Sequence, residues 1–252
     1  MCAECRPDRS QIVNTLNYVQ LKEDINYIPN EKHDVVAGIC AIGYLPRPEI
    51  KEGYEKNQLI DKKFVGKKWG LETAIYINDD LELTETISVS GGLRYSHYAH
   101  IGPDTVFQYL PGIPRTKDAI TDTTLHPTFS NIRNFGGIEP RFSVRINTLP
   151  NQSVKMSYNR MRQYIHQISN TTAPTPIDLW LVSYEHLPPQ IADNFSIGYF
   201  WNIKDNRWET SLEGFFKNIR NLVEYKDFPE LLVNNHIETE FLTGKGRAFG
   251  AE

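Results

Sequence analysis

The chain alternates apolar and polar residues in strand-length stretches, and the connections between these stretches are alternately very short and very long. The short connections are Asp80–Thr84, Thr148–Asn151 and Lys204–Asn206, and the long, irregular ones are Leu45–Lys67, Ala99–Gly137 and Gln163–Ala192. This rhythm is typical of a transmembrane β-barrel of the bacterial outer membrane, with short periplasmic turns and long extracellular loops. A soluble β-sandwich also alternates strands and turns, but its long loops are not restricted to one end.

About nine strands are expected from the alternation. They are Gln11–Asn26, His33–Tyr44, Lys68–Asn78, Glu85–Tyr98, Ile138–Asn147, Gln152–Arg162, Asp193–Ile203, Arg207–Asn218 and Ile237–Glu252. No strong helical period is present, and Leu179–Tyr184 is the one stretch that could hold a short turn of helix. We therefore expect an all-β, antiparallel fold.

The two faces of the strands differ in polarity. Val144 and Ile146 face one way, whereas Arg141 and Arg145 face the other. A sandwich would give the same alternation with its apolar face turned inward, so alternation alone leaves both folds open. Strand length favours the barrel, because about nine to eleven residues cross a bilayer, whereas globular strands average about five or six residues.

Aromatic residues lie near the ends of the expected strands, where a barrel meets the two membrane–water interfaces. Trp201 and Trp208 flank the short connection at Lys204–Asn206, which places them at the periplasmic girdle. The expected outer girdle consists of Tyr44, Trp69, Tyr95 and Tyr98. Ordinary edge aromatics of a soluble sheet are the alternative interpretation.

Composition and charge exclude several classes of protein. The net charge of −4 and the lack of a basic cluster argue against nucleic-acid binding. No uninterrupted apolar run approaches the roughly eighteen residues of a transmembrane helix. No apolar signal segment follows Met1, so we expect a fragment or an altered start, with residues 1–10 as an atypical N-terminal segment.

Several motifs resemble one family, the TonB-dependent outer-membrane receptors. ETAIYINDD at Glu72–Asp80 with GGLRYS at Gly91–Ser96 resembles a mid-barrel hairpin, and IEPRF at Ile138–Phe142 with VKMSYN at Val154–Asn159 resembles the next. GKGRAFGAE at Gly244–Glu252 looks like a later strand of that barrel. The Pro174–Trp180 and Pro188–Gln190 segments resemble a loop of Bacteroidetes members of the family.

The resemblance implies a fold and a function. The family's architecture is a 22-stranded barrel filled by an N-terminal plug domain. About nine strands would form only part of it, so residues 11–252 are expected to be a partial barrel without the plug. The implied function is import of a scarce nutrient (siderophore, vitamin, glycan or peptide) with energy from the TonB complex. The resemblance also implies that the protein lies in the outer membrane in contact with its lipid. It implies no cofactor. A passive pore or a surface-binding β-barrel or β-sandwich module remains the alternative.

Two groups of candidate site residues follow from these expectations. Loop residues suited to ligand contact are Phe107, Tyr109, His126, Phe129, Arg133, Trp180 and Tyr184. Charged residues expected to face the lumen and the plug are Glu72, Arg94, Glu139, Arg141, Arg145 and Glu213.

Catalytic and metal-binding functions find little support in the sequence. No motif of a metalloprotease or a serine hydrolase occurs, so no catalytic residue is expected. The lone Cys2–Cys5 pair and the buried-type Cys40 lack the second pair or nearby histidines of a zinc site. The histidines of the expected loops, His126, His166, His186 and His236, are expected to be solvated rather than metal ligands.

Overall fold

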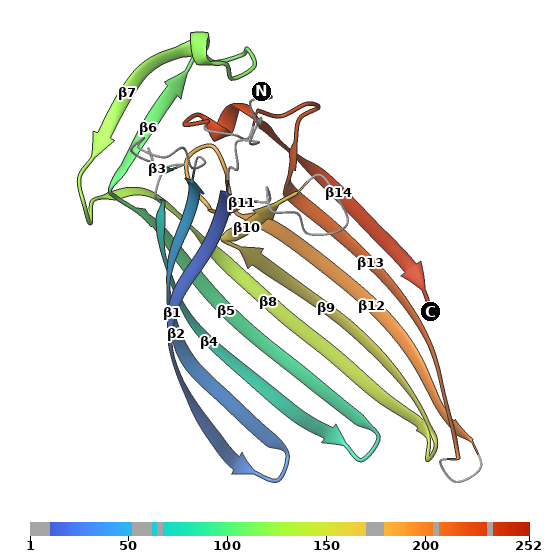
Figure 1. The fold of residues 1–252 in the computed structure, drawn as a ribbon. Coiled ribbons are helices and arrows are strands. Elements are labelled where there is room, and N and C mark those ends of the chain that lie inside the picture. The colour runs from blue at the N-terminus through green and yellow to red at the C-terminus, as the bar shows by residue number, and fades with distance from the viewer. Residues whose placement is uncertain (1–10, 52–61, 65–67, 170–178, 204–206, 231–233) are drawn as a thin grey trace, which may run out of the picture.

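One continuous antiparallel sheet makes up most of the molecule (Figure 1). The computed structural model describes residues 11–51, 62–64, 68–169, 179–203, 207–230 and 234–252. The strands of the sheet follow one another in the order β1-β2-β4-β5-β8-β9-β12-β13-β14, and β3 pairs with β2. Apart from the short strands inserted in the connections, each strand therefore pairs with the one before it and the one after it in the chain, as in an up-and-down barrel. The described part forms an open, curved sheet.

Each expected strand has a counterpart, and most are longer than expected. The last one is shorter: it begins at Phe241 rather than Ile237, because Ile237–Thr239 form a 3₁₀ turn. The strands of the path are β1 (Gln11–Asn30), β2 (His33–Lys51), β4 (Trp69–Thr84), β5 (Ile87–Ile101), β8 (Asn131–Leu149), β9 (Gln152–Gln163), β12 (Gln190–Ile203), β13 (Trp208–Tyr225) and β14 (Phe241–Ala251). The shorter strands are β3 (Lys62–Phe64), β6 (Asp104–Tyr109), β7 (Ile120–His126), β10 (Ile165–Ile168) and β11 (Leu179–Val182). Two 3₁₀ turns are present, η1 (Lys117–Ala119) and η2 (Ile237–Thr239).

The short and long connections lie at opposite ends of the sheet, as expected (Figure 1). The position of one turn was wrong: Asp80–Thr84 belong to β4, and the chain turns at Glu85 and Thr86. Cross-strand pairing of Thr84 with Ile87 sets this turn. The turn expected within Thr148–Asn151 lies at Pro150 and Asn151. Lys204–Asn206, like residues 1–10 with Cys2 and Cys5, lies outside the described residues.

The long connections contain structure of their own. β6 and β7 form a separate hairpin between β5 and β8. β10 and β11 form a second hairpin between β9 and β12. Leu179–Tyr184 therefore begins with a strand and not with the short turn of helix that the sequence allowed there. Among the described residues there is no helix long and apolar enough to span a membrane.

The apolar face of the sheet is uncovered. Ile75 on β4 and Leu212 on β13 are 64% and 65% exposed, although they lie in the middle of long strands. Val144 pairs with Val89 of β5 and with Met156 of β9, so apolar residues of neighbouring strands lie side by side on the same face. A sandwich would bury this face against a second sheet. An uncovered apolar face on a curved meander is the arrangement of a transmembrane barrel, whose outer surface meets lipid.

The buried core lies at the loop end, on the opposite, concave face. The β10–β11 hairpin contacts β1 and β2 on one side and β13 on the other. Its Ile168 and Leu181 pack with Phe241 in one buried cluster. A second cluster contains Tyr98 and Tyr164, whose stacked rings have centroids 4.9 Å apart. Residues 164–168 and 179–187 thus fold inward and pack against the concave face at its loop end.

The aromatic residues at the loop end divide between the two faces. Tyr98 is fully buried among the concave-face residues, and the Tyr44 hydroxyl donates to Glu72 on that same face. The expectation that Tyr44 and Tyr98 belong to an outer girdle was therefore wrong. Both residues lie at polar positions of the two-residue alternation in β2 and β5. The expectation considered only that they lie at the ends of the strands, and not which face of the sheet they occupy. Trp201 and Trp208, by contrast, share the outward face with Leu212.

Candidate functional site

Paired charges line the concave face beneath the loops. Arg94 on β5 donates to the Glu72 carboxylate on β4 at 2.8 Å, and its Nε lies 3.9 Å from Glu139 on β8. Glu139 is 4% exposed and also accepts from the Ser96 hydroxyl, which lies 2.7 Å from the Tyr164 hydroxyl. One guanidinium therefore compensates two buried carboxylates on its two neighbouring strands. Buried charges require such partners.

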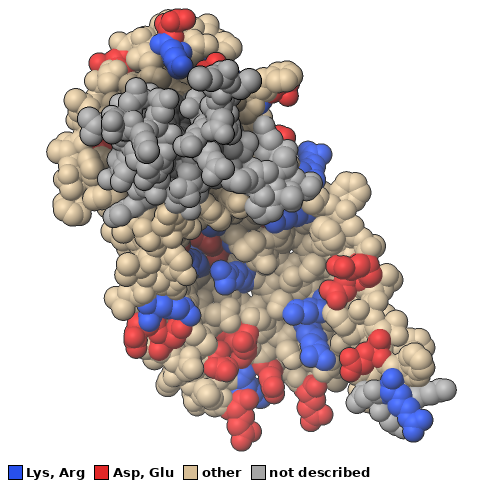
Figure 2. All heavy atoms as spheres, in the orientation of Figure 1, with Lys and Arg blue, Asp and Glu red and all other residues tan. Residues whose placement is uncertain are grey.

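The other lumen candidates lie on the same face and nearer the turns. Arg141 stands opposite Gly92, Arg145 opposite Lys155 and Glu213 opposite Gly198 in the register. All three side chains are exposed, and within the described part of the chain none takes part in an ion pair. Figure 2 shows acidic and basic side chains gathered below the loops on the face turned to the viewer. The concave face thus presents unpaired charges of both signs.

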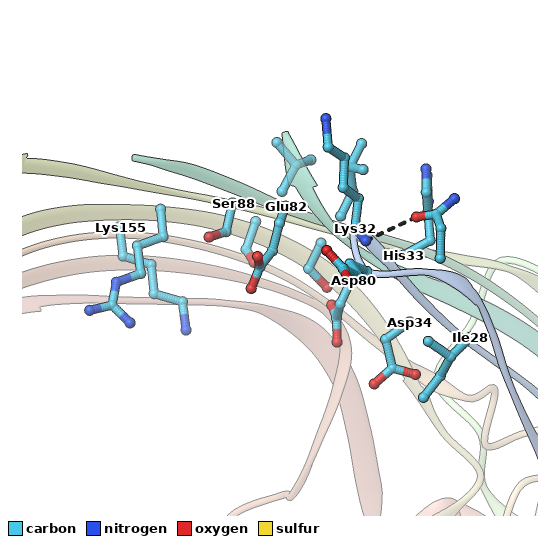
Figure 3. Close-up of a pocket in the computed structure, with 15 residues that line it drawn as sticks. Ile28, Lys32, His33, Asp34, Asp80, Glu82, Ser88 and Lys155 are labelled. Carbon is cyan, nitrogen blue, oxygen red and sulfur yellow. Dashed lines mark hydrogen bonds between the residues drawn. The ribbon is translucent and has the colours of Figure 1, made fainter. Parts of the chain in front are cut away.

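A hollow of about 580 Å³ lies on the concave face at the turn end. In Figure 3, Asp34, Asp80 and Glu82 lie on the β2–β4 side of this hollow, and Lys155 lies at its other side. Arg145 belongs to the same lining as Lys155. The lining therefore carries acidic side chains together with Lys32 on the β2–β4 side, and basic side chains on the other side.

The β6–β7 hairpin is anchored to the top of the sheet by one carboxylate. The Lys68 ammonium lies 2.7 Å from Asp104 Oδ2, and His100 Nε2 lies 3.2 Å from the same atom. Burial would raise the pKa of Asp104, but the contacts with His100 and Lys68 hold that pKa below its usual value. The ammonium of Lys68 also lies over the Tyr184 ring, 4.1 Å from its centroid.

Three loop segments converge above this anchor. Glu238 of η2 accepts from the Tyr109 hydroxyl at 3.0 Å and from the Tyr184 hydroxyl at 3.4 Å. Burial and the nearby Glu238 carboxylate raise the pKa of both phenols well above the ordinary value. Both hydroxyls therefore stay protonated as donors. One carboxylate thereby joins the β6 hairpin, the loop after β11 and the segment before β14.

Histidine rings complete the same cluster. His186 Nε2 lies 2.7 Å from the Phe107 carbonyl oxygen, to which it donates. Burial lowers the pKa of His186, although the Phe107 carbonyl opposes this shift. The rings of Phe107 and His236 have centroids 4.3 Å apart. Arg115 donates to the His186 carbonyl and lies over the Phe241 ring. The cluster thus combines aromatic faces with hydrogen-bonding groups.

The structure brings three of the seven loop candidates together and leaves four apart. Phe107, Tyr109 and Tyr184 belong to the cluster around Glu238. Phe129 is 80% exposed and lies beside Trp69, with ring centroids 6.0 Å apart. The remaining three are Arg133 over the Phe135 ring, His126 opposite Asp104 and Trp180 opposite Gln167.

Sequence reasoning missed the groups that organise the cluster. Glu238, Arg115 and Asp104 carry no local motif, and each acts on a residue from a distant part of the chain. The expectation of solvated loop histidines was wrong for His166, which is 2% exposed in β10 and lies 3.1 Å from the Ser183 hydroxyl. Among the described residues, no three His, Cys, Asp or Glu side chains are grouped to hold a metal ion.

A family profile described as "TonB dependent receptor-like, beta-barrel" matches residues 30–252. No curated protein matches the chain in sequence.

Solved structures of similar fold include two receptors and an iron transporter from three bacteria. The ferric-catecholate import receptor Fiu of E. coli K12 is 17% identical, with a TM-score of 0.52 over 95% of this chain and 35% of Fiu. The hemophore receptor HasR of Serratia marcescens, solved with its hemophore HasA and heme, is 13% identical, with a TM-score of 0.57 over 97% of this chain and 39% of HasR. The FrpB iron transporter of Neisseria meningitidis is 14% identical, with a TM-score of 0.51 over 94% of this chain and 33% of FrpB. The chain thus spans little more than a third of these structures.

Proposed function

Because the chain belongs to the TonB-dependent receptor-like β-barrel family, we propose that it forms part of a receptor that binds a scarce nutrient outside the cell and imports it with energy from the TonB complex. Proteins of this family lie in the outer membrane and are transporters rather than enzymes. The partners of the proposed receptor are the TonB complex, outer-membrane lipid and a siderophore, vitamin, glycan or peptide.

The observation that carries this proposal is the contrast between the two faces of one sheet. The outward face is apolar and uncovered, as lipid contact requires. The concave face carries the Arg94 ion pairs near the loops and the exposed charges Arg141, Arg145 and Glu213 nearer the turns. Polar contacts of this kind hold a plug in a wet lumen while remaining breakable during transport. A plug domain is therefore the proposed occupant of the concave face.

Ligand selection is assigned to the loop cluster. Phe107, Tyr109 and His186 present aromatic faces and hydrogen-bonding groups at the end where an external ligand arrives. Binding residues are commonly carried on loops that a rigid scaffold positions. The scaffold here is the set of contacts from Glu238 and Asp104, which fix the β6–β7 hairpin above the sheet.

The experiment measures uptake by the full-length gene product in cells that lack their own receptors. The probes are a ferric catecholate, heme, Cu²⁺, cyanocobalamin and a labelled oligosaccharide, each tested with and without a functional TonB. We expect uptake of one probe, dependent on TonB and lost when residues 104–126 are replaced by a short Gly-Ser linker. Normal heat-modifiable mobility of this variant would show that the barrel still assembles.

Two outcomes would contradict the proposal. Diffusion of small solutes of unrelated chemistry, unchanged without TonB, would identify a passive pore. Unchanged uptake after replacement of the hairpin, with normal assembly, would remove ligand selection from this cluster.

A further inference from the structure

The β6–β7 hairpin has one strand edge that no other described strand pairs with. Among the strands that the structure describes, β7 has a single partner, β6. It is the outermost strand at the upper left of Figure 1, and its residues Thr121 to Leu125 are all exposed. The outer edge of β6, by contrast, is partly covered, because His186 Nε2 donates to the Phe107 carbonyl oxygen at 2.7 Å. The open edge of the hairpin is therefore that of β7.

The register shows which backbone groups face this open edge. In an antiparallel pair, opposing residues alternate between pairs that exchange both hydrogen bonds and pairs whose N–H and C=O groups point away from each other. Phe107, opposite Thr123, accepts from a segment outside the hairpin, so this pair is of the second kind. The Thr121 hydroxyl donates to the Gln108 carbonyl oxygen at 3.2 Å, which agrees with a Gln108 carbonyl directed at β7. By the two-residue period, Thr123 and Leu125 present their N–H and C=O groups at the open edge.

β7 lacks the usual protection of an exposed edge. Lysine, proline and bulges blunt such edges in many proteins, but the sequence of β7, ITDTTLH, contains neither Lys nor Pro. Its one irregularity is at Thr121, which the register passes over between Ile120 and Asp122. Residues 122–126 pair with β6 in unbroken register, and threonine favours extended backbone. These residues therefore form a regular edge to which another strand could be added.

Contacts at its base and near its tip hold the hairpin in place. At the base, Asp104 lies 2.7 Å from the Lys68 ammonium. Further along β6, the Tyr109 hydroxyl donates to Glu238 at 3.0 Å. Near the tip, Arg115 donates to the His186 carbonyl oxygen at 3.3 Å. A strand that is already held in position loses little conformational entropy when a partner pairs with it.

We propose that the open edge of β7 binds an extended peptide segment outside the cell, which adds a third strand to the hairpin. Unpaired backbone donors and acceptors recognise the backbone of such a segment by β-augmentation. The peptide runs antiparallel to β7 and exchanges hydrogen bonds with Thr123 and Leu125. Asp122 then lies in a pair that exchanges none, where opposing side chains are closest, so a basic residue is favoured opposite it. This surface is separate from the contacts around Glu238 and does not depend on TonB-driven import.

The test separates backbone pairing from side-chain contact. Full-length protein in lipid nanodiscs is titrated with a short, capped, fluorescent peptide of alternating threonine and valine with a central lysine. Fluorescence polarisation measures binding. A second peptide has the same side chains and a methyl group on every backbone amide nitrogen. We expect it to bind roughly tenfold or more weakly, because it donates no backbone hydrogen bond.

Two substitutions at one position give matched variants. Thr123→Pro removes an N–H that faces the open edge and none that faces β6, so the hairpin should stay paired, as proline is tolerated at sheet edges. It should weaken binding of the unmethylated peptide roughly tenfold, whereas Thr123→Val keeps the backbone donor and should bind like the wild type. Hydrogen-exchange protection of the Val106 and Gln108 amides, which face β7, checks that the hairpin is paired in both variants.

A third variant tests the position of the bound strand. Asp122→Asn should weaken binding of the lysine peptide by roughly two- to threefold, because it removes the opposing charge. It should leave unchanged the binding of a peptide that has glutamine in place of the lysine.

Three results would overturn the proposal. Absence of binding by the unmethylated peptide, or equal binding of the methylated one, would show that the edge does not recognise a peptide backbone. Unchanged binding to Thr123→Pro with a paired hairpin would place the peptide elsewhere. Self-association of the peptide-free protein that Thr123→Pro abolishes would assign the edge to a second copy of the chain.

Discussion

The phenol ring of Tyr98 on β5 lies over the α-carbon of Gly70 on β4, where a Cβ would overlap the ring. Tyr98 is fully buried and stacks on Tyr164, with the two ring planes 5° apart. This contact positions the start of the inward-folded segment on the sheet. Glycine at position 70 is therefore required by close approach rather than by backbone conformation.

Replacing Gly70 by valine should destabilise the full-length protein by about 1–3 kcal/mol, because the stacked rings must move. The matched control is Gly43→Val on β2, where a Cβ meets nothing within 4 Å. It should change stability by less than about 0.5 kcal/mol. Urea unfolding from lipid vesicles measures both. Equal effects of the two variants would mean that the Tyr98 ring does not occupy this position.

Arg94→Met should lower the free energy of unfolding by more than Gly70→Val does. It leaves the buried carboxylates of Glu72 and Glu139 without their shared cation, which should cost about 3–5 kcal/mol. Arg141→Met, on the same face but exposed, should cost less than about 1 kcal/mol. The same unfolding measurement applies, and a small effect of Arg94→Met would show that the two carboxylates are solvated or otherwise compensated.

The orientation of β8 predicts opposite responses at two adjacent residues. Val144 faces outward, so Val144→Arg near the bilayer midplane should cost about 2–4 kcal/mol. Ser143 faces the lumen, where Ser143→Arg should have little effect because the added charge stays in water. Folding yield into vesicles and unfolding midpoints measure the difference. A larger cost at position 143 would reverse the assignment of the two faces.

The β10–β11 hairpin should loosen in mild acid. Burial lowers the pKa of His166 from 6.5 to about 4, so the folded hairpin holds a neutral ring whereas the unfolded one accepts a proton. Its stabilising effect is complete above pH 6.5 and is lost as the pH falls towards 4. We expect a loss of about 2 kcal/mol between pH 7 and pH 5.

Hydrogen exchange of β10 and β11 amides, corrected for intrinsic rates, measures this loss in the full-length protein. His166→Gln, which has no group that titrates in this range, should remove the pH dependence. A wild-type hairpin whose protection stays constant between pH 7 and pH 5 would contradict the burial of a neutral His166.

The strands could be predicted from sequence because each obeys a strict two-residue period over many residues, as between Arg141 and Asn147. Turn positions were less predictable, since the register of Thr84 with Ile87 places the turn after residues that look turn-like on their own. The hairpins within the long connections depend on contacts distant in sequence, such as Lys68 with Asp104, which no local pattern reports.

The candidate site likewise has a part that could be predicted from sequence and a part that could not. Arg94, Glu72 and Glu139 could be placed on one face from their alternation, but their mutual pairing depends on strand register. Phe107, Tyr109 and Tyr184 could be selected as loop aromatics. Glu238, which joins two of them, could not, because it lies 129 residues from Tyr109 in the sequence.

The central claim, that one face of this sheet meets lipid and the other an aqueous lumen, is tested most directly along β12. Single cysteines are placed at positions 195 to 200 of the full-length protein, in a background whose native cysteines are serine, and labelled with an environment-sensitive fluorophore in outer-membrane vesicles. Quenching by nitroxide lipid should be strong at positions 195, 197 and 199, and quenching by iodide should be strong at positions 196, 198 and 200. Protection of the odd-numbered positions from the lipid quencher would show that protein covers the apolar face, and would contradict the barrel assignment.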